Sequence, residues 1–358
     1  MLEVSLHSVS NFALHDVTLT FAASSHTAIV GAPASGASTL LHLIAGTVRP
    51  KSGEIRIGAR PVTNLRPSQR PLLFVTSALD VPYRWSVRHA LIAAVRRRSL
   101  DRVDRQHEYA LAVDKWTLDR IIDRTIGTLS ASEQTLVHLA QIELLRPGIL
   151  VADRLLERLN PAASEEVIDM IYRTLRVAGT TVITAPASRA ELGVTDRVIV
   201  LAAGRVAQEG TAAQIYTSPV DERAAAATGA VNLIPITIDG SSIESIIGGW
   251  EVASPPFQGT GIALVRPEAF SIAAPGAESD LIVAVEEAAF ENGRWLVRAM
   301  LSGSVVLRIS LSASQHLHKG KLIALTYEPA GFSLIQREIA VERRSVPTGI
   351  IPSMSSSR

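Results

Sequence analysis

The chain opens with alternating apolar and polar positions and then changes to continuous apolar runs and helical spacing. Residues 2–22 alternate in two short runs, which is the pattern of antiparallel strands. The short run HTAIV at 26–30 ends at Gly31, and STLLHLIAG at 38–46 has helical spacing and ends on a glycine, a common helix stop. The pattern therefore predicts a strand, a glycine-containing loop and a helix in that order.

The next part of the chain alternates helical and strand patterns. Residues 80–145 have mostly helical spacing and include the arginine-rich stretch RHALIAAVRRR at 88–98. Buried strands are predicted at ILVAD (149–153) and TTVITA (180–185), and two strands around a turn at DRVIVLAAGRVAQEG (196–210). Alternating strands and helices predict an α/β fold with a parallel sheet.

The composition changes after about residue 218. DERAAAATGA at 221–230 has the pattern of a helix or a linker, and from Val231 onward the segments are short, β-rich and punctuated by glycine. This pattern predicts a small all-β barrel as a second domain. The tail at 346–358 is rich in serine and proline, and we expect it to be disordered.

Composition and net charge exclude several kinds of site and partner. The chain has 358 residues, enough for two domains, and 47% of them are hydrophobic. The net charge is +1, so no global charge favours nucleic acid as a partner. With no cysteine, disulfide frameworks and thiolate metal sites are excluded. No run reaches the ~18 apolar residues of a membrane helix, so we expect any membrane role to act through partners.

Residues 31–39, GAPASGAST, have the frame of a phosphate-binding loop, G-x-x-x-x-G-K-[ST]. The position of the lysine holds Ala37 instead. The expected order of strand, loop and helix would aim backbone amides and a helix N-terminus at an anion. The loop is thus predicted to keep the shape of a phosphate cradle without its positive charge.

Several further segments in a fixed order make the chain resemble the ATP-binding subunits of ABC importers, of the sugar-type subgroup with a C-terminal TOBE domain. The resemblance covers roughly residues 1–340. The segments are GAPASGASTLLHLIAGTVRPKSGEIRIG (31–58), FVTS (74–77), LSASEQ (129–134), RPGILVADRLLERLNP (146–161), DRVIVLAAGRVAQEGTAAQIYTSP (196–219), NLIP (232–235) and VRPE (265–268).

The resemblance implies an α/β P-loop ABC ATPase domain at 1–220, with a helical subdomain at about 78–147. An all-β, OB-like TOBE domain at 221–345 and the tail at 346–358 follow. It also implies partners: a second ATP-binding subunit, two transmembrane permease subunits and, indirectly, a substrate-binding protein, with no nucleic acid. The chain would lie peripherally on the cytoplasmic face of the inner membrane.

The departures from the family pattern fall on catalytic positions. Ala37 replaces the Walker A lysine, Ser77 the Q-loop glutamine, Arg154 the general base after Walker B, and Ala185 the switch histidine. The signature LSGGQ becomes LSASE at 129–133, and the D-loop aspartate becomes Asn160. An arginine cannot act as a base, because its pKa stays above about 12. No catalytic residue is therefore predicted at the chain's own site.

Nucleotide binding requires fewer positioned groups than hydrolysis does. The resemblance therefore still implies residues that would bind the nucleotide. The nucleotide candidates are Gly31, Ser35, Gly36, Ala37, Ser38 and Thr39 of the loop, Phe12 as the adenine-stacking ring, and Ser130 toward the nucleotide of a partner subunit. Ser38 and Asp153 are the candidate Mg²⁺ ligands. ATP and Mg²⁺ binding is expected to be weakened, because charge-assisted hydrogen bonds of about 1.5–3 kcal/mol each are lost with the lysine.

Each of these residues also has a simpler interpretation. The loop fits an ordinary strand–helix turn, Asp153 fits a cap, Ser130 fits a helix N-cap, and Arg154 fits a surface ion pair. His42, His89 and His138 have no metal-ligand partners at suitable spacing and are interpreted as structural. Tyr83, Arg84 and Trp85 lie where the family receives the coupling helices of its permeases.

Three function classes remain open. The leading hypothesis is a degenerate, non-catalytic ATP-binding subunit of an importer that pairs with an active paralogue and couples closure of the dimer to the permeases. The second is an active ATPase with atypical residues, for which Glu157 is a poor substitute base because of its register. The third is a regulatory or scaffold pseudo-ATPase that has left transport.

Overall fold

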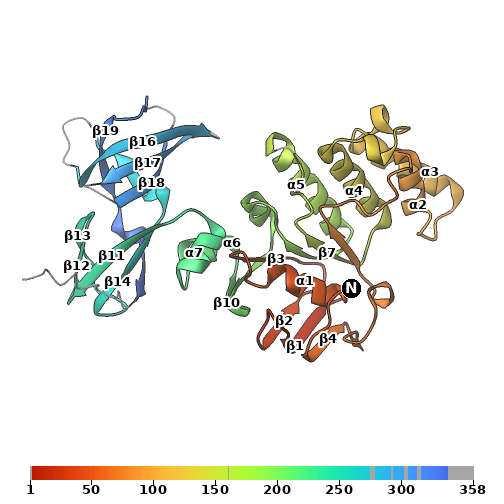
Figure 1. The fold of residues 1–358 in the computed structure, drawn as a ribbon, viewed down its shortest axis with the longest axis horizontal. Coiled ribbons are helices and arrows are strands. Elements are labelled where there is room, and N and C mark those ends of the chain that lie inside the picture. The colour runs from red at the N-terminus through yellow and green to blue at the C-terminus, as the bar shows by residue number, and fades with distance from the viewer. Residues whose placement is uncertain are drawn as a thin grey trace, which may run out of the picture. The chain divides into compact units, whose positions relative to one another are not determined.

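The computed structural model describes residues 2–159, 161–274, 279–291, 293–301, 305–312 and 316–337. The chain divides into two compact units, Met1–Val231 and Asn232–Arg358 (Figure 1). Asn160 and the tail predicted to be disordered at 346–358 lie outside the described residues.

The first unit is built on a six-stranded sheet with the order β10-β9-β3-β8-β7-β6. Its strands are β3 (His26–Gly31), β6 (Leu73–Thr76), β7 (Ile149–Asp153), β8 (Thr181–Ala185), β9 (Arg197–Ala202) and β10 (Arg205–Gly210). Neighbouring strands are parallel except for β10, which pairs with β9 as the predicted antiparallel hairpin. The prediction of an α/β parallel sheet is confirmed, and the carboxyl ends of the parallel strands share one edge.

A smaller antiparallel sheet lies beside helix α1 (Ala37–Ala45). It has the order β2-β1-β4-β5 and consists of β1 (Val4–Ser10), β2 (Val17–Phe21), β4 (Ser52–Ile57) and β5 (Arg60–Pro61). Leu41 of α1 packs in one core cluster with Leu6 of β1 and Val151 of β7. Helix α1 therefore joins the two sheets, and it ends at Gly46 with a φ of 83°, a left-handed conformation that suits glycine.

Helices cover the rest of the first unit. They are α2 (Val87–Val95), α3 (Arg102–Lys115), α4 (Ala131–Leu145) and α5 (Pro161–Val177), with short 3₁₀ turns at Pro67–Gln69, Asp119–Ile121, Ile126–Thr128 and Arg189–Val194. Leu91 of α2, Trp116 after α3 and Val137 of α4 share a core cluster with Leu155 and Ile171. The helical spacing of residues 80–145 thus corresponds to three helices with a common apolar core.

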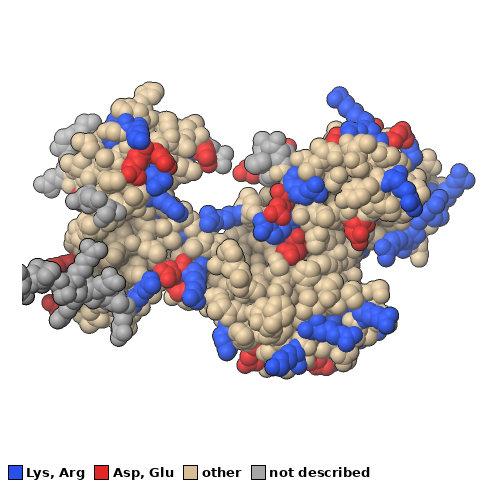
Figure 2. Space-filling view, viewed as in Figure 1, with Lys and Arg blue, Asp and Glu red and all other residues tan. Residues whose placement is uncertain are grey.

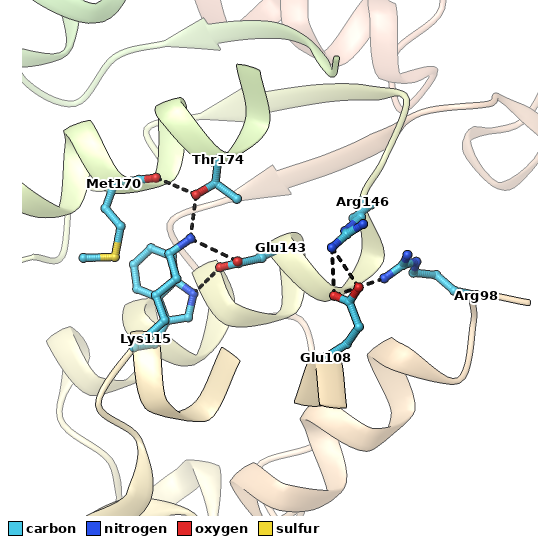
Figure 3. Close-up of polar contacts among 8 residues, drawn as sticks. Arg98, Glu108, Lys115, Glu143, Arg146, Met170 and Thr174 are labelled. Carbon is cyan, nitrogen blue, oxygen red and sulfur yellow. Dashed lines mark hydrogen bonds and ion pairs between the residues drawn. The ribbon is translucent and has the colours of Figure 1, made fainter. Parts of the chain in front are cut away.

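A polar cluster links α3, α4 and α5 (Figure 3). Nζ of Lys115 donates to Oε1 of Glu143 at 3.0 Å and to Oγ1 of Thr174 at 2.6 Å, while Nε1 of Trp116 donates to Oε2 of Glu143 at 2.7 Å. The Thr174 hydroxyl donates in turn to the Met170 carbonyl at 2.7 Å. The helices that follow β6 are thereby tied to α5, the helix that follows β7.

Two arginines share one carboxylate close to this cluster (Figure 3). Nη2 of Arg146 lies 2.8 Å from Oε1 of Glu108, and Nη1 of Arg98 lies 3.5 Å from its Oε2. Basic and acidic side chains both lie on the visible face of the first unit, and basic side chains gather at the end that carries α2 and α3 (Figure 2).

Two short helices complete the first unit, α6 (Ala212–Thr217) and α7 (Glu222–Thr228). The segment at 221–230, which fitted a helix or a linker, is thus largely helical. Ala224 of α7 is fully buried and packs with Val198 of β9 and Ile215 of α6. These contacts group α7 with the first unit, although the sequence suggested a boundary near residue 220.

The second unit is all-β, as predicted, and its described strands form two five-stranded antiparallel sheets. One has the order β13-β12-β11-β14-β20 and consists of β11 (Asn232–Asp239), β12 (Ser242–Ser245), β13 (Gly248–Glu251), β14 (Gly259–Val265) and β20 (Ser333–Gln336). The other has the order β15-β19-β16-β17-β18 and consists of β15 (Phe270–Ile272), β16 (Leu281–Glu291), β17 (Arg294–Leu301), β18 (Val305–Ser312) and β19 (Leu322–Tyr327).

Both sheets contribute to one core. Ile236 of β11 and Val283 of β16 belong to the same buried cluster, and β11 alternates strictly between buried and exposed positions. Short 3₁₀ turns lie at Pro267–Ala269 and Pro329–Gly331. The described strands thus form two sheets that share one apolar interior, in keeping with the all-β domain that the sequence predicted.

Candidate functional site

The loop between β3 and α1 is tightly bent, and its two glycines are required by the bend. A Cβ added at Gly31 would lie 2.4 Å from both the Leu201 carbonyl oxygen and Oγ of Ser35. Gly36 has a φ of 103°, and Ala34 has a φ of 66°. The amide of Ser35 donates to the Ala32 carbonyl at 2.9 Å and closes the turn.

The loop ends at the N-terminus of α1, and within the described residues no side-chain hydrogen bond from the N-cap closes that end. Gly36 is the N-cap and has no side chain, and the first turn, residues 37–39, contains no acidic residue. The first amides of a helix have no partner within the helix, and the helix dipole favours an anion near them. Ala37, Ser38 and Thr39 therefore begin a helix whose N-terminal end is suited to a phosphate, although the lysine is missing.

The segment before β2 holds the loop from one side. The carbonyl of Ser35 accepts from the Gly204 amide at 3.1 Å, and the Gly204 carbonyl accepts from the His15 amide at 2.9 Å. Oδ1 of Asn11 accepts from the amide of Leu14 at 2.8 Å, which bends the chain back at Phe12. The Phe12 side chain is 82% exposed at this bend. An exposed ring there is suited to stacking on a base, and its role remains a prediction.

Ser38 and Asp153, the candidate Mg²⁺ ligands, lie together. Oγ of Ser38 donates to Oδ1 of Asp153 at 3.1 Å, which links the first turn of α1 to the end of β7. A hydroxyl and a carboxylate are hard oxygen donors of the kind that Mg²⁺ accepts beside phosphate oxygens. The donor chemistry therefore fits Mg²⁺, and the carboxylate caps no helix here.

The positions where catalytic residues were expected to be replaced converge on the same edge of the sheet. In the sheet register Thr76 pairs with Asp153, and Asp153 pairs with Ala185. Ser77 directly follows Thr76, and the Arg154 amide donates to the Ala185 carbonyl at 2.9 Å. Three segments far apart in the sequence thus bring Ser77, Arg154 and Ala185 to one place, beside the loop.

Arg154 is turned toward a neighbouring carboxylate. Its φ of 51° is left-handed, and its Nη2 lies 2.6 Å from Oε1 of Glu157. Of the interpretations that the sequence allowed, the structure shows the surface ion pair. The pair occupies the carboxylate of Glu157, which was the one nearby substitute for a base.

Ala185 is buried in the core between α1 and the sheet. The packing therefore matches the small side chain that the sequence has here.

The first turn of α4 is closed by its own side chains. Oγ of Ser130 accepts from the Glu133 amide at 3.2 Å, and Oε2 of Glu133 accepts from the Ser130 amide at 2.7 Å. Oε1 of Glu133 also lies 3.1 Å from Nη1 of Arg124. The hydrogen bond from the Ser130 amide is the main cause that lowers the pKa of Glu133. Ser130 is thus a helix N-cap, as one interpretation of the sequence proposed.

Comparison with known proteins agrees with this geometry. Residues 14–156 match the family described as ABC transporter. A solved ATP-binding subunit of an ABC transporter superposes with a TM-score of 0.53 at 19% identity, covering 60% of this chain and 91% of that one. A dimeric bacterial ABC transporter cassette superposes with a TM-score of 0.52 at 20% identity, covering 58% of this chain and 98% of that one. The first unit has the fold of an ABC transporter ATPase.

The curated relatives to which this chain is similar are named as import proteins. A Fe(3+) ions import ATP-binding protein of Streptomyces avermitilis is 29% identical over 248 residues, 68% of this chain and 71% of the relative. The Escherichia coli K12 protein of the same name is 25% identical and covers 83% and 86%, respectively. An sn-glycerol-3-phosphate import ATP-binding protein of Cereibacter sphaeroides is 28% identical and covers 77% and 81%.

One further side chain, which the sequence did not single out, lies beside the candidate site. His42, interpreted as structural, places its Nε2 3.9 Å from Oδ2 of Asp153. The signal was present in the spacing, since His42 lies four residues after Ser38 and shares its face of α1. Its proximity to Asp153, more than a hundred residues away in the sequence, depends on the sheet order.

Two features are absent from the described part of the chain. Within it, no helix combines the length and apolar character that crossing a membrane requires. Among the same residues, no three or more His, Cys, Asp or Glu side chains lie together in a group that could hold a metal ion.

Proposed function

We propose that this chain is a non-catalytic ATP-binding subunit of an ABC importer that pairs with a catalytically intact paralogue. The observation that carries the proposal is the ion pair between Arg154 and Glu157. It puts a cation at the position of the general base and pairs it with Glu157, the residue that was considered as a substitute base.

Nucleotide binding is supported by the loop and the open end of α1. Gly31, Ser35 and Gly36 preserve the bend, and the first turn of α1 remains suited to an anion. When bound, Mg²⁺ would neutralise phosphate charge, and Ser38 and Asp153 are the residues that would hold it. The affinity is expected to be low, because Ala37 contributes no charge.

This site lacks the residues that would catalyse ATP hydrolysis. A general base contributes about 10²–10⁴ to a rate, and phosphoryl transfer depends on positioned charges around the phosphate. Ala37, Ser77, Arg154 and Ala185 replace these groups together. The composite site formed by the partner's Walker A loop and Ser130 of this chain is the one left for turnover in the complex.

The importer role is supported by the relatives and by the surface of the first unit. The relatives are named as import ATP-binding proteins, and this chain covers most of their length. Tyr83 is 69% exposed in the segment before α2, where we place the contact with the permease subunits. The second, all-β unit would act as a TOBE domain, and the chain would lie on the cytoplasmic face of the inner membrane.

The test is to purify the tagged full chain from its native membrane and identify what accompanies it. An intact ATP-binding paralogue together with two permease subunits would support the proposal. A homodimer free of permeases, or a soluble partner alone, would contradict it and favour the regulatory pseudo-ATPase. Turnover by the chain alone that is lost in the Asp153→Asn variant would favour an atypical active ATPase.

A further inference from the structure

The end of the first unit that carries α2 and α3 has a basic surface (Figure 2). Arg96 and Arg97 follow the last turn of α2, Arg102 begins α3, and all three side chains are exposed. Because only residues 98–101 separate Arg97 from Arg102, the chain holds the three positions within about 22 Å of one another. We call these three arginines the basic patch.

The basic patch has no acidic partner among the described residues. The neighbouring Arg98 lies 3.5 Å from Glu108, whereas no described carboxylate forms an ion pair with an arginine of the patch. The closest acidic residues along the chain act within α3, where Oδ1 of Asp101 accepts from the Asp104 amide at 2.8 Å and caps the helix. The positive charge of the patch is therefore available to a partner outside the chain.

Helix stability does not explain a cluster of arginines at this place. The helix dipole favours Arg96, which lies at the C-terminal end of α2, but disfavours Arg102 in the first turn of α3. A charge that lowers the stability of its own helix suggests a role in binding.

Exposed apolar side chains continue the same surface along α3. Val103 is 75% exposed and Leu111 is 53% exposed. Val103, His107 and Leu111 follow one another at the i, i+4 spacing that puts residues on one side of a helix, and all three are exposed. The surface thus has arginines at one end and apolar side chains along the helix that begins there.

We propose that the basic patch and the exposed side of α3 bind the surface of a membrane that contains anionic phospholipid. Arginine forms paired hydrogen bonds with phosphate, and a helix that exposes both basic and apolar side chains is suited to the interface of a bilayer. Val103 and Leu111 favour lipid over nucleic acid, because a bilayer presents an apolar layer beneath its charged headgroups. A lipid surface is therefore the occupant that matches both kinds of side chain.

This inference rests on the proposed location of the chain at the cytoplasmic face of the inner membrane. Anionic lipids give that leaflet a negative surface potential, which attracts arginines close to it. The contact would hold α2 and α3 against the bilayer in addition to any contact with permease subunits. Its test uses the isolated chain and lipid alone, so its failure is distinguishable from failure of the importer proposal.

The test measures co-sedimentation of the full chain with vesicles of equal parts phosphatidylcholine and phosphatidylglycerol. Vesicles of phosphatidylcholine alone are the neutral comparison. The patch variant removes the three arginines of the basic patch: Arg96→Gln, Arg97→Gln and Arg102→Gln. The matched control removes the same charge at three exposed positions elsewhere in the first unit: Arg49→Gln, Arg60→Gln and Arg205→Gln.

We expect the wild-type chain to bind the mixed vesicles and not the neutral ones. The patch variant should bind at least about tenfold more weakly, whereas the control should stay within about twofold of wild type. Salt at about 1 M, where the Debye length is about 3 Å, should also weaken wild-type binding. Equal binding by the wild-type chain and the patch variant would overturn the proposal.

The apolar contribution has its own pair of variants. Val103→Ser combined with Leu111→Ser is expected to weaken binding to the mixed vesicles at least about threefold. The control combines Val177→Ser and Val220→Ser, which are 86% and 53% exposed in wild type, and should leave binding unchanged. Equal losses in both double variants would contradict a specific contact by α3.

A further readout leaves the basic patch intact and uses the absence of cysteine from the chain. Gln106→Cys places a polarity-sensitive fluorophore on the exposed side of α3, and Ala59→Cys places it in the turn between β4 and β5. On mixed vesicles the emission should shift to the blue at position 106 and stay constant at position 59. An unshifted emission at position 106, or binding to duplex DNA but not to vesicles, would overturn the proposal.

Discussion

Ser130 and Glu133 cap one another at the start of α4. The Ser130 hydroxyl accepts from the Glu133 amide at 3.2 Å, and the Glu133 carboxylate accepts from the Ser130 amide at 2.7 Å. The N-terminus of α1 has only Gly36 at the same place. Of two helix ends that are expected to face nucleotides, one is thus open to an anion and the other already holds the chain's own carboxylate.

The charge of Glu133 is expected to add pH-dependent stability. Because the folded state lowers its pKa below the ordinary value of 4.5, the stabilisation is present above pH 4.5 and is lost as the pH falls through the folded pKa. Glu133→Gln can keep the capping geometry but removes the charge, which is worth about 0.5 kcal/mol at a helix N-terminus. Urea unfolding at pH 7 should show this deficit, and the deficit should be smaller at pH 3.5 than at pH 7.

The control for this prediction is Glu166→Gln, at an exposed position of α5. It is expected to leave the free energy of unfolding unchanged at both pH values. A Glu133→Gln deficit that is equal at pH 7 and pH 3.5 would show that the charge does not act through the cap.

Ala37→Lys is expected to strengthen ATP binding. The position is the first of α1, and a lysine there would restore charge-assisted hydrogen bonds of about 1.5–3 kcal/mol, or roughly 10- to 150-fold in affinity. Titration with a fluorescent ATP analogue measures the change. Ala59→Lys, an exposed position in the turn between β4 and β5, adds the same charge away from the site and should change affinity less than twofold.

Arg154→Glu alone is expected to leave the purified chain without ATP turnover. The substitution returns a carboxylate to the position of the base, but Ala37, Ser77 and Ala185 still lack the groups that position and neutralise the phosphate. A phosphate-release assay on the isolated chain measures this. Turnover in Arg154→Glu would mean that the arginine is the only obstacle, contrary to the collective loss proposed here.

Replacing the buried Arg70 is expected to lower the free energy of unfolding strongly. It is 4% exposed, and its Nη1 donates to the Leu43 and Ile44 carbonyls at 2.7 and 2.6 Å, at the C-terminal end of α1. Arg70→Met removes both bonds and those that Arg70 donates to the Leu65 and Thr63 carbonyls, a loss of about 3 kcal/mol. Urea unfolding should show it, whereas the exposed Arg60→Met should lie within about 0.5 kcal/mol of wild type.

The pair of Lys115 and Glu143 is expected to couple more strongly than an exposed pair. Its atoms lie 3.0 Å apart, and Trp116 and Thr174 share the same cluster. A double-mutant cycle with Lys115→Met and Glu143→Gln should give about 1 kcal/mol or more. The same cycle for Arg88 and Asp123, a well-exposed pair 2.8 Å apart, should stay below about 0.5 kcal/mol. Equal coupling energies would contradict a special role for the cluster.

The sequence by itself determined the elements and their order. The alternation at 2–22, the glycine stop of α1 and the apolar run before Asp153 each depend on neighbouring residues, so local patterns suffice to predict them. The same local information identified Ser130 as a candidate N-cap, because capping depends on residues three apart.

Only the tertiary structure decided which side chains meet. The sheet order places Asp153 between Thr76 and Ala185 and brings His42 and Ser38 of α1 to its carboxylate. Likewise, the φ of 51° at Arg154 and its contact with Glu157 select one of several orientations that the sequence allowed. Contacts between distant segments follow from strand order and packing, and a chain's local pattern does not contain them.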